Sequence, residues 1–541
     1  MKKDKRFSIR KAVFFPLLAI YAAVIALGII SPKMFTQVEN AVVNFACNWF
    51  GWLYQYLTIG MVIICVWVLF SKKIGSIRLG GKDAKPVMSK WNWFAVSLCG
   101  GIATGIVFWG IAEPITHFVD GIPGLSVGGT REAALYALST CYMHWGFPLY
   151  AYYAVAGIGI GIAVYNMRLS YTVSSGLYSL VGRRINGRLG DIIDLLCLFS
   201  IAGAVSACLG VASMQIGSGT GLLAGFTPTP KTWAIILVII VATFVISSYT
   251  GVQKGLRWMS DKNAKIYLLL LLYVFIVANT KNILAMSTES TGFFAQNWIV
   301  QNTYLGVMAD GTSNSQWPVW WTLNYWSFMV AYTPMMGIFL AKIARGRTLR
   351  EFVLFNFALP GGFGMLWFSI FGSASINMEI NGAGIYEAMK NTGLESTIFA
   401  FFKNLPFSSI LSVIFILTAF LSVVTLADGM TTTITTMTLT SKVADSAEPP
   451  SSFKVFWGVI MASLAFINIA SAAITGNTSG IDATKLLAIT CAFPLLFVVL
   501  LLAIACVKTL RQYHEKYNVV DDSAHAIVDA DMIVTHDEEE I

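Results

Sequence analysis

The chain has 541 residues, of which 56% are hydrophobic and only 12% are charged. A soluble protein carries about twice that charged fraction, so the composition excludes an ordinary soluble protein and predicts a chain that lies largely in lipid. The formal net charge of +8 comes from 36 Lys and Arg against 28 Asp and Glu.

The eight cysteines and five histidines form no CxxC pair and no spacing typical of a zinc site. All cysteines except Cys47 lie in apolar stretches, where a thiol behaves as a small hydrophobic side chain. We therefore expect no disulfide framework, no bound metal and no cofactor. The sequence also contains no phosphate-binding G-x-x-x-x-G-K-[ST] loop and no catalytic Ser/His/Asp or paired-carboxylate cluster, which argues against ATP-driven transport by this chain and against an enzyme.

Twelve stretches meet the requirement for a membrane span, which is about 20 mostly apolar residues. They lie at about 13–31, 50–70, 92–114, 134–164, 190–213, 232–250, 265–280, 318–341, 351–372, 407–430, 455–475 and 485–507. The first follows the basic start of the chain without a small-residue cleavage site, so we expect a retained helix and no signal peptide. Segment 289–306 is too polar to span and is predicted to be an interfacial amphipathic helix.

Positive charges support this topology, because Lys and Arg resist translocation across the membrane. With the N-terminus inside, all but seven of the 36 Lys and Arg fall in predicted cytoplasmic segments. The seven outside are Lys33, Arg131, Lys231, Lys281, Lys390, Lys403 and Lys485. The sequence thus predicts a multi-pass protein of a bacterial cytoplasmic membrane with both termini cytoplasmic, and a short, acidic, disordered tail from about residue 509.

The third predicted span contains the glycine-rich run 100–114, GGIATGIVFWGIAEP. Glycines in a membrane helix either permit close helix packing or mark a break. An unwound stretch at Gly101–Gly105 would expose backbone groups near the bilayer midplane, where secondary transporters bind their ligands. In that interpretation Ala103 and Thr104 contact the substrate.

The fourth predicted span contains Trp145, Tyr150 and Tyr153, which fall near one another on a helix. Three aromatic rings around a cavity can bind a cation that has no proton to lose. The more common alternative is that such aromatic side chains form a stripe that faces lipid or the protein core. Pro148 lies between them and favours a local irregularity, and therefore a site.

The eighth predicted span offers a second set of aromatic and thioether side chains. Trp326, Phe328, Met329 and Tyr332 could close the cage from the opposite helix. Trp317 and Trp320 precede them and are expected in the aromatic belt of the membrane interface.

Four motifs occur in a fixed order along these spans. The first motif, Gly-x-x-x-Gly-x-x-Phe-x-Gly-x-x-Glu-Pro, consists of Gly101, Gly105, Phe108, Gly110, Glu113 and Pro114, and the second is a His-Trp-Gly box formed by His144, Trp145 and Gly146. The third, Trp-Thr-x-x-Tyr-Trp, consists of Trp321, Thr322, Tyr325 and Trp326. The fourth, Phe-x-Ala-[Arg/Lys]-Ile-x-[Arg/Lys]-Gly-Arg-[Thr/Ser]-x-Arg-Glu, runs from Phe339 to Glu351. With the twelve-span pattern, these motifs resemble the betaine/carnitine/choline transporter family over most of the chain.

The resemblance implies an all-α membrane protein whose core is a five-plus-five inverted repeat, and a homotrimer. The expected divisions are 1–12, cytoplasmic N-terminus; 13–91, peripheral spans 1 and 2; 92–284, first repeat; 285–317, interfacial helix and external loop; 318–508, second repeat; and 509–541, cytoplasmic tail. It places the substrate between spans 3, 4, 8 and 10, and the implied contacts are Trp145, Tyr150, Tyr153, Trp326, Phe328, Met329, Tyr332, Ala103 and Thr104.

The chain departs from the family pattern at the lid of this cage. Members that bind a trimethylammonium group place consecutive tryptophans in the eighth span, where this chain has Phe328 and Met329, and a further tryptophan where it has Tyr332. This departure would allow the site to accept a substrate whose headgroup differs from trimethylammonium or is bulkier.

A second departure concerns the ion. Sodium-coupled members carry adjacent Thr-Ser hydroxyls in the tenth span, whereas this chain has Thr425 followed by Leu426, which has no oxygen to offer a hard cation. The sodium-independent carnitine exchanger of the family also has Thr-Leu there and a methionine matching Met336, while its arginine is replaced by Asn263. The region assigned to coupling is Ile102, Thr425, Leu426 and Met336.

These observations predict a secondary active transporter of a quaternary-ammonium or related zwitterionic solute, of the carnitine, betaine or choline type, working by sodium-independent exchange. The alternatives are a sodium- or proton-coupled symporter of the same solutes, a sodium-coupled amino-acid carrier and, from another class, a membrane sensor or channel. The expected partners are the solute and the lipid membrane, with no nucleic acid. Glu113 and Asp428 lie near predicted span ends, so a helix-cap or interface role is expected rather than a proton relay.

Overall fold

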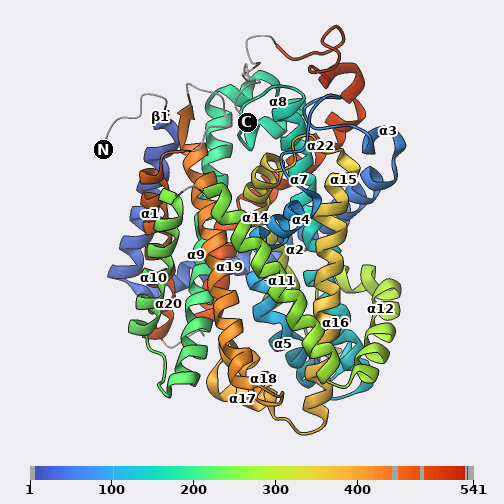
Figure 1. The fold of residues 1–541 in the computed structure, drawn as a ribbon, viewed down its shortest axis with the longest axis vertical. Helices are drawn as coiled ribbons and strands as arrows, with labels where there is room; N and C mark the ends of the chain where they lie inside the picture. The colour runs from blue at the N-terminus through green and yellow to red at the C-terminus, as the bar shows by residue number, and fades with distance from the viewer. Residues whose placement is uncertain are drawn as a thin grey trace.

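A computed structural model describes residues 7–101, 103–250, 252–441, 449–475, 480–529 and 533. Helices dominate these residues, and Figure 1 shows them packed side by side as an elongated bundle. Two short antiparallel strand pairs join loops at its ends: β1 (Phe7–Ile9) with β4 (Leu439–Ser441), and β2 (Gly121–Ile122) with β3 (Ser126–Val127).

The helices follow in chain order. The first part of the chain forms α1 (Lys11–Ile30), α2 (Pro32–Phe70), α3 (Lys72–Gly75), α4 (Lys90–Gly101), α5 (Ala103–Asp120), α6 (Arg131–Trp145), α7 (Phe147–Tyr165), α8 (Tyr178–Val181), α9 (Arg188–Ala224), α10 (Pro230–Thr250), α11 (Val252–Val277) and α12 (Thr280–Thr303). The second part forms α13 (Trp317–Trp320), α14 (Thr322–Lys342), α15 (Leu349–Val353), α16 (Leu359–Ile380), α17 (Ile385–Thr392), α18 (Thr397–Lys403), α19 (Ser408–Thr438), α20 (Ser451–Thr475), α21 (Gly480–Ala492) and α22 (Leu495–Arg511). Single 3-10 or π turns are η1 (Ser174–Leu177), η2 (Gly182–Asn186), η3 (Leu354–Ala358), η4 (Leu394–Ser396) and η5 (Tyr513–Tyr517).

The predicted all-α membrane class is confirmed. Among the described residues, seven helices are long and apolar enough to cross a membrane, and the number rises to nine if two bent helix pairs each count as one span. Each of the twelve predicted stretches lies on one of the helices or helix pairs. Large apolar side chains such as Ile30, Trp49 and Phe70 are exposed on the outside of the bundle, as expected where lipid replaces water.

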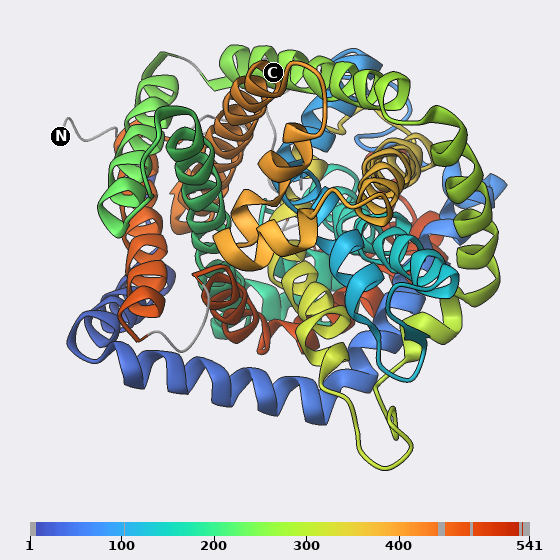
Figure 2. The ribbon, with the colours of Figure 1, turned by 90° about the horizontal axis from the view of Figure 1, so that it is seen from below.

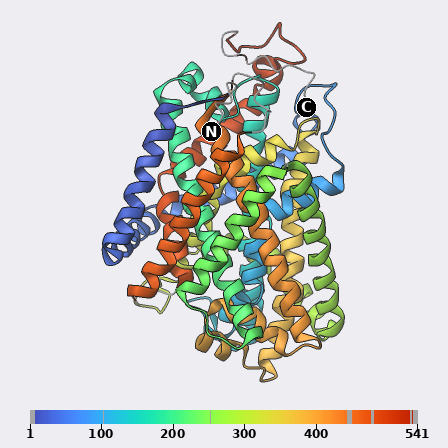
Figure 3. The same ribbon diagram turned by 60° about the vertical axis from the view of Figure 1, so that its left-hand side comes forward.

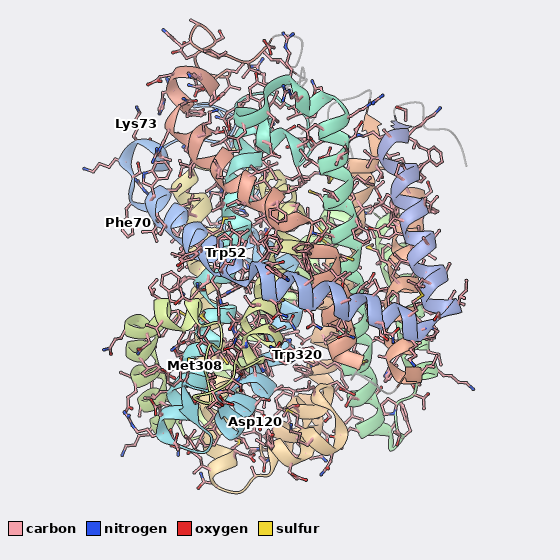
Figure 4. All side chains as sticks on the ribbon, turned by 180° about the vertical axis from the view of Figure 1, so that it is seen from behind. Trp52, Phe70, Lys73, Asp120, Met308 and Trp320 are labelled. Atoms are coloured by element: carbon pink, nitrogen blue, oxygen red, sulfur yellow. The ribbon has the colours of Figure 1, made fainter. Side chains whose placement is uncertain are left out.

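Helix α2 is longer than the predicted span 50–70. Its 39 residues extend about 58 Å at about 1.5 Å per residue, nearly twice the roughly 30 Å of the hydrocarbon layer. A helix of that length must run obliquely, and Figure 4 shows α2 crossing the bundle at a slant, with Trp52 along its length and Phe70 at its end. In Figure 2 the same helix lies along the rim, which agrees with a peripheral element.

The two ends of the bundle carry different elements. Strand β1 and helices α3, α8 and α15 share one end, while α17 and α18 lie at the other (Figure 1). Lys73, in the loop predicted to be cytoplasmic, lies toward the first end, and Asp120 lies toward the opposite end (Figure 4). The loops that carry α3, α8 and α15, all predicted to lie on one side of the membrane, therefore share one end of the bundle, and which end faces the cytoplasm stays a prediction. Figure 3 shows α1 at one edge of the bundle, where it packs against α20.

The fourth predicted span is broken, close to the expected irregularity at Pro148. Helix α6 ends at Trp145 and α7 begins at Phe147, with Gly146 between them at φ −94° and ψ −140°. Helix α16 passes so close that a Cβ at Gly364 would lie 2.1 Å from the carbonyl oxygen of Trp145. Glycine at position 364 therefore allows α16 to contact the break directly.

The unwound stretch predicted at Gly101–Gly105 is wrong for most of its length. Helix α4 continues to Gly101 and α5 starts at Ala103, so Thr104 and Gly105 are helical. Ile102 lies outside the described residues. Backbone groups within a helix are satisfied by that helix in lipid, whereas those of an unwound stretch need partners from elsewhere.

The disordered tail predicted from residue 509 is also wrong as far as residue 529. Helix α22 continues to Arg511 and is followed by η5. The side chain of Asn166 donates to the Tyr513 hydroxyl at 2.6 Å, and the backbone N–H of Lys82 donates to Asp521 at 2.9 Å. These contacts with loops at the same end of the bundle order the segment despite its acidic composition.

Candidate functional site

An aromatic cluster lies where α14 packs along α7, and we define it as Tyr150, Tyr153, Phe328, Met329 and Tyr332. The rings of Tyr150 and Tyr153 meet edge to face at 6.4 Å, and the Tyr153 hydroxyl donates to the Met329 sulfur at 3.3 Å. All are buried except Phe328, which is half-buried. The predicted approach of the fourth and eighth spans is therefore present.

Tyr332 connects this aromatic cluster to α9. Its ring lies 4.8 Å from that of Phe328, and its hydroxyl donates to the carbonyl of Ala204 at 2.8 Å and lies 2.9 Å from the Cys208 sulfur. Tyr153 also lies beside Cys208. The two tyrosines therefore approach each other from α7 and α14 next to a third helix, which the sequence reasoning did not include.

The indole N–H of Trp326 is directed toward α2. Its indole N–H donates to the side chain of Gln55 on α2 at 2.8 Å, and its ring stacks on Tyr152 at 6.4 Å. Gln55 was missed by the sequence reasoning, although a buried amide within an apolar helix is a signal that could have found it. Trp326 thus joins α14 to the peripheral helix α2.

Trp145 is held by a carboxylate that the sequence reasoning had placed at a helix end. Its indole N–H donates to Glu113 Oε2 at 2.6 Å, and the Tyr325 hydroxyl donates to the same oxygen at 2.6 Å. Trp145 also stacks on Phe368 with ring centroids 6.0 Å apart and meets Tyr325 edge to face at 5.1 Å.

The other oxygen of Glu113 faces two histidines. His144 Nδ1 lies 2.6 Å from Oε1 and His117 Nε2 lies 3.6 Å from it, while His144 Nε2 contacts the Thr322 hydroxyl at 3.0 Å. The carboxyl group and both imidazoles are fully buried. The expected helix-cap or interface role of Glu113 is therefore wrong, because the carboxylate joins α5, α6 and α14 inside the bundle.

We refer to Glu113, His117, His144, Trp145, Thr322 and Tyr325 as the Glu113 cluster. Glu113, His117 and His144 bring three possible metal-ligand atoms within 4.8 Å of one another. Zinc holds such atoms at about 2.0–2.2 Å, which places two tetrahedral ligand atoms about 3.3 Å apart. The 2.6 Å between Glu113 Oε1 and His144 Nδ1 is instead a hydrogen-bond distance, so the arrangement fits a hydrogen-bonded cluster better than a metal centre.

His117 was missed by the sequence reasoning, although its spacing from Glu113 offered a signal. Residues four apart lie on the same face of a helix, and both are polar within an apolar span. His117 lies against Trp321 and Trp317, with ring centroids 4.4 Å and 5.2 Å away. Trp317, expected at the membrane interface, thus contacts an internal residue, while Trp320 is exposed.

Polar side chains on α19, in and beside the predicted coupling region, form hydrogen bonds within that helix and with α11. The Thr425 hydroxyl donates to the carbonyl of Leu421 at 2.7 Å, and Leu426 is buried. One turn earlier, the Ser422 hydroxyl is 2.6 Å from both the Asn263 amide nitrogen and the Tyr267 hydroxyl. The hydrogen bonds among Asn263, Tyr267 and Ser422 therefore join α11 to α19.

The remaining predicted site residues are placed less fully. Met336 is buried on α14. Ala103 and Thr104 form the start of α5, although nothing is described of their side chains. Ile102 lies outside the described residues. Asp428 lies within α19, so the expected helix-cap role is wrong; the residue is buried and pairs with Lys454 on α20 at 2.9 Å.

Comparisons with known proteins agree with this architecture. Residues 12–515 match the model of the betaine/carnitine/choline family transporters. The glycine betaine transporter OpuD of Bacillus subtilis is 30% identical over 93% of this chain and 94% of its own length. The betaine/ectoine transporter LcoP of Corynebacterium glutamicum is 31% identical over 93% of this chain and 78% of its own.

A probable glycine betaine transporter of Desulfitobacterium hafniense is 29% identical over 90% of this chain and 95% of its own length. Both the family match and these relatives extend over nearly all the described helices. The chain therefore belongs to the betaine/carnitine/choline transporter family, and it is a multi-pass membrane transporter of a small solute and not an enzyme.

Proposed function

We propose that this chain is a secondary active transporter of a quaternary-ammonium zwitterion of the betaine type. Relatives named as glycine betaine or betaine/ectoine transporters support the solute class. The observation that carries the proposal is the buried aromatic cluster on α7 and α14. A methylated ammonium has no N–H to donate, so aromatic faces and a polarisable sulfur are the groups that recognise it.

Trp145 completes the proposed site from the end of α6. Cation–π attraction is strongest at an indole face, and each such face contributes about 0.5–2 kcal/mol in a desolvated site. Glu113 orients this indole through its N–H. Tyr325, Met329 and Tyr332 follow at i, i+4 and i+7 on α14, so one face of that helix runs from the Glu113 cluster to the aromatic cluster.

The phenylalanine, methionine and tyrosine of α14 offer weaker and more flexible surfaces than a set of indoles. We infer that the site accepts headgroups larger than that of glycine betaine, including carnitine. Met329 supports this, because a thioether side chain with several rotatable bonds adapts to ligands of different shape.

We further propose that transport is sodium-independent exchange. Leu426 offers no oxygen, so the Thr425 hydroxyl is the side-chain oxygen that this pair of positions could give to an ion. A sodium site assembled here would rely mainly on backbone carbonyls. Met336 matches a methionine of the sodium-independent exchanger that this chain resembles, whereas Asn263, which donates to Ser422, stands in place of that exchanger's arginine.

At the level of architecture, we propose that 92–284 and 318–508 form the two inverted repeats around this site. Residues 13–91 then form the peripheral helices, and 285–317 the interfacial helix with its external loop. We also propose a homotrimer with both termini in the cytoplasm. The exposed apolar face of α2 offers surface for lipid or for a neighbouring subunit.

The solute class is tested by competition for glycine betaine uptake into proteoliposomes. We expect carnitine and choline to compete, and an excess of proline or glycine to leave uptake unchanged. Recognition through methyl groups on nitrogen predicts this order. An amino acid that competes better than every quaternary-ammonium solute would contradict the proposed function and favour an amino-acid carrier.

A further inference from the structure

Tyr150 carries a buried hydroxyl that has no hydrogen-bond partner among the described residues. The other two tyrosines of the aromatic cluster use theirs: Tyr153 donates to the Met329 sulfur at 3.3 Å, and Tyr332 donates to the carbonyl of Ala204 at 2.8 Å. A buried phenol hydroxyl usually finds an acceptor, because leaving it unpaired in a dry interior is unfavourable. Tyr150 therefore has a donor available for a ligand.

The immediate neighbours of Tyr150 do not take up this donor. Its ring meets that of Tyr153 edge to face at 6.4 Å, so the ring itself packs within the aromatic cluster. Cys99 on α4 also lies beside Tyr150, but its thiol is directed to the carbonyl of Ser260, with the sulfur 3.5 Å from that oxygen. The side chain of Tyr150 thus reaches from α7 toward the last turn of α4.

The donors on the other side of the proposed site are already engaged. The indole N–H of Trp145 and the hydroxyl of Tyr325 both donate to Glu113 at 2.6 Å. A zwitterion brings a carboxylate together with its methylated ammonium, and burying a carboxylate is costly unless hydrogen-bond donors receive it. Among the side chains of the proposed site that carry an N–H or O–H, Tyr150 is the one whose donor is unpaired in the part of the chain that the structure describes.

The position of Tyr150 along α7 also favours an anion. Tyr150 is the fourth residue of this helix, which begins at Phe147 after the break at Gly146. Glycine has no side chain that could cap the helix, so no side-chain acceptor covers the first N–H groups, and they carry a partial positive charge. This charge acts mainly within the first turn, where Tyr150 lies. The phenol O–H and the start of α7 therefore favour a ligand group of the same sign.

We propose that the Tyr150 hydroxyl donates a hydrogen bond to the carboxylate of the transported zwitterion, which makes Tyr150 the residue that distinguishes a zwitterion from a solute that is only a cation. This inference rests on the proposed function, because it requires the aromatic cluster to bind the solute. The ammonium group then lies among Tyr153, Phe328, Met329 and Tyr332, and the carboxylate extends toward Tyr150.

This role differs from the one predicted from the sequence. There Tyr150 and Tyr153 were expected to act alike, as two aromatic faces for the cation. The structure separates them by their hydroxyls, since that of Tyr153 is held by Met329 and that of Tyr150 is not held. A site with a buried donor also discriminates against a solute that cannot accept from it, because the donor then stays unpaired.

The test compares two solutes that share a methylated ammonium group. Glycine betaine carries a carboxylate, whereas tetramethylammonium carries none. Their dissociation constants are measured by calorimetry on the purified full-length protein in detergent. Tyr150→Phe keeps the ring and removes the hydroxyl, so we expect glycine betaine to bind about tenfold or more weakly and tetramethylammonium to change by less than about twofold.

Tyr152→Phe is the matched control on the same helix. Tyr152 is also buried, but its hydroxyl lies 2.8 Å from that of Thr58 on α2. Its removal should leave the ratio of the two dissociation constants unchanged. An unchanged affinity for glycine betaine in Tyr150→Phe would overturn the assignment, and so would an equal loss for both solutes, which would indicate general damage to the site.

Two further readouts separate a ligand-binding hydroxyl from a structural one. Because the hydroxyl has no partner in the protein, Tyr150→Phe should not lower the thermal midpoint of the solute-free protein. A marked fall, or failure of the variant to fold, would show that the hydroxyl serves the fold and would overturn the proposal. The infrared carboxylate band of bound, isotope-labelled glycine betaine should shift in Tyr150→Phe and stay in place in Tyr152→Phe. Coincident bands in all three proteins would exclude the hydrogen bond.

The proposed function and this inference fail in different ways. If neither glycine betaine nor tetramethylammonium binds to the unmodified protein, the proposed solute class is wrong, and the role of Tyr150 falls with it. If both bind and Tyr150→Phe leaves the ratio of their dissociation constants unchanged, the solute class stands and only the role of Tyr150 is wrong.

Discussion

Two buried carboxylates, Glu113 on α5 and Asp428 on α19, differ in the partners that hold them. Asp428 pairs with the ammonium group of Lys454 on α20. Glu113 receives hydrogen bonds from an indole, a phenol and an imidazole, with a second imidazole nearby. The first arrangement is an ion pair between two helices, whereas the second is a hydrogen-bonded group that joins three helices. The role of a buried acid therefore depends on the partners that hold it.

The largest effect should come from breaking the fixed pair. Lys454→Met removes the ammonium partner of the buried Asp428, and loss of one partner of a buried ion pair costs about 3–5 kcal/mol of the free energy of unfolding. The double variant Asp428→Asn with Lys454→Met should recover much of this loss. Thermal midpoints in detergent measure both. A single variant as stable as the unmodified protein would mean that the pair contributes nothing.

A smaller loss is expected at Glu113. Glu113→Gln keeps the shape of the side chain but replaces charged acceptors by neutral ones, and hydrogen bonds to a charged group are worth about 1.5–3 kcal/mol. The amide also cannot accept from the indole and the phenol if its NH₂ faces them. We expect a loss of about 2–3 kcal/mol on the same thermal assay, with no rescue by a change at Lys454.

Trp145 sharpens the comparison, because it reports on the proposed solute. Trp145→Leu keeps bulk but removes the indole face, so glycine betaine affinity should fall about tenfold, which corresponds to about 1.4 kcal/mol. Trp52→Leu is the matched control, since Trp52 is exposed on α2. Equal affinities in the two variants would exclude Trp145 from the site.

The smallest effects should separate two tyrosines on α14. The Tyr325 hydroxyl donates to the charged Glu113, whereas the Tyr332 hydroxyl donates to a neutral backbone carbonyl. Tyr325→Phe should therefore cost about 1.5–3 kcal/mol and Tyr332→Phe about 0.5–1.5 kcal/mol of unfolding free energy. The reverse order would indicate that Glu113 carries no charge in the folded protein.

The helical spans and the family could be predicted from the sequence, because hydrophobic length, charge asymmetry and motif order are local properties. The approach of Tyr153 to Met329 also followed from the motifs. The Glu113 cluster could not be derived in the same way. Its members come from α5, α6 and α14, and a residue near the end of a predicted span gives no indication of what packs beside it.

Two errors concern segments whose order depends on distant partners. The glycine-rich run was expected to unwind, but residues 103–105 are helical, since glycine permits close packing as well as a break. The tail was expected to be disordered from its charge, but Tyr513 and Asp521 contact Asn166 and Lys82. Composition alone does not show whether such partners exist.

We propose that this chain exchanges one quaternary-ammonium solute for another without sodium. Counterflow measures it most directly: proteoliposomes are loaded with unlabelled glycine betaine, diluted into sodium-free buffer, and given labelled solute outside. We predict rapid, transient accumulation of label, unchanged by sodium and absent from empty vesicles. Uptake that requires an inward sodium gradient and is not accelerated by internal solute would contradict the account.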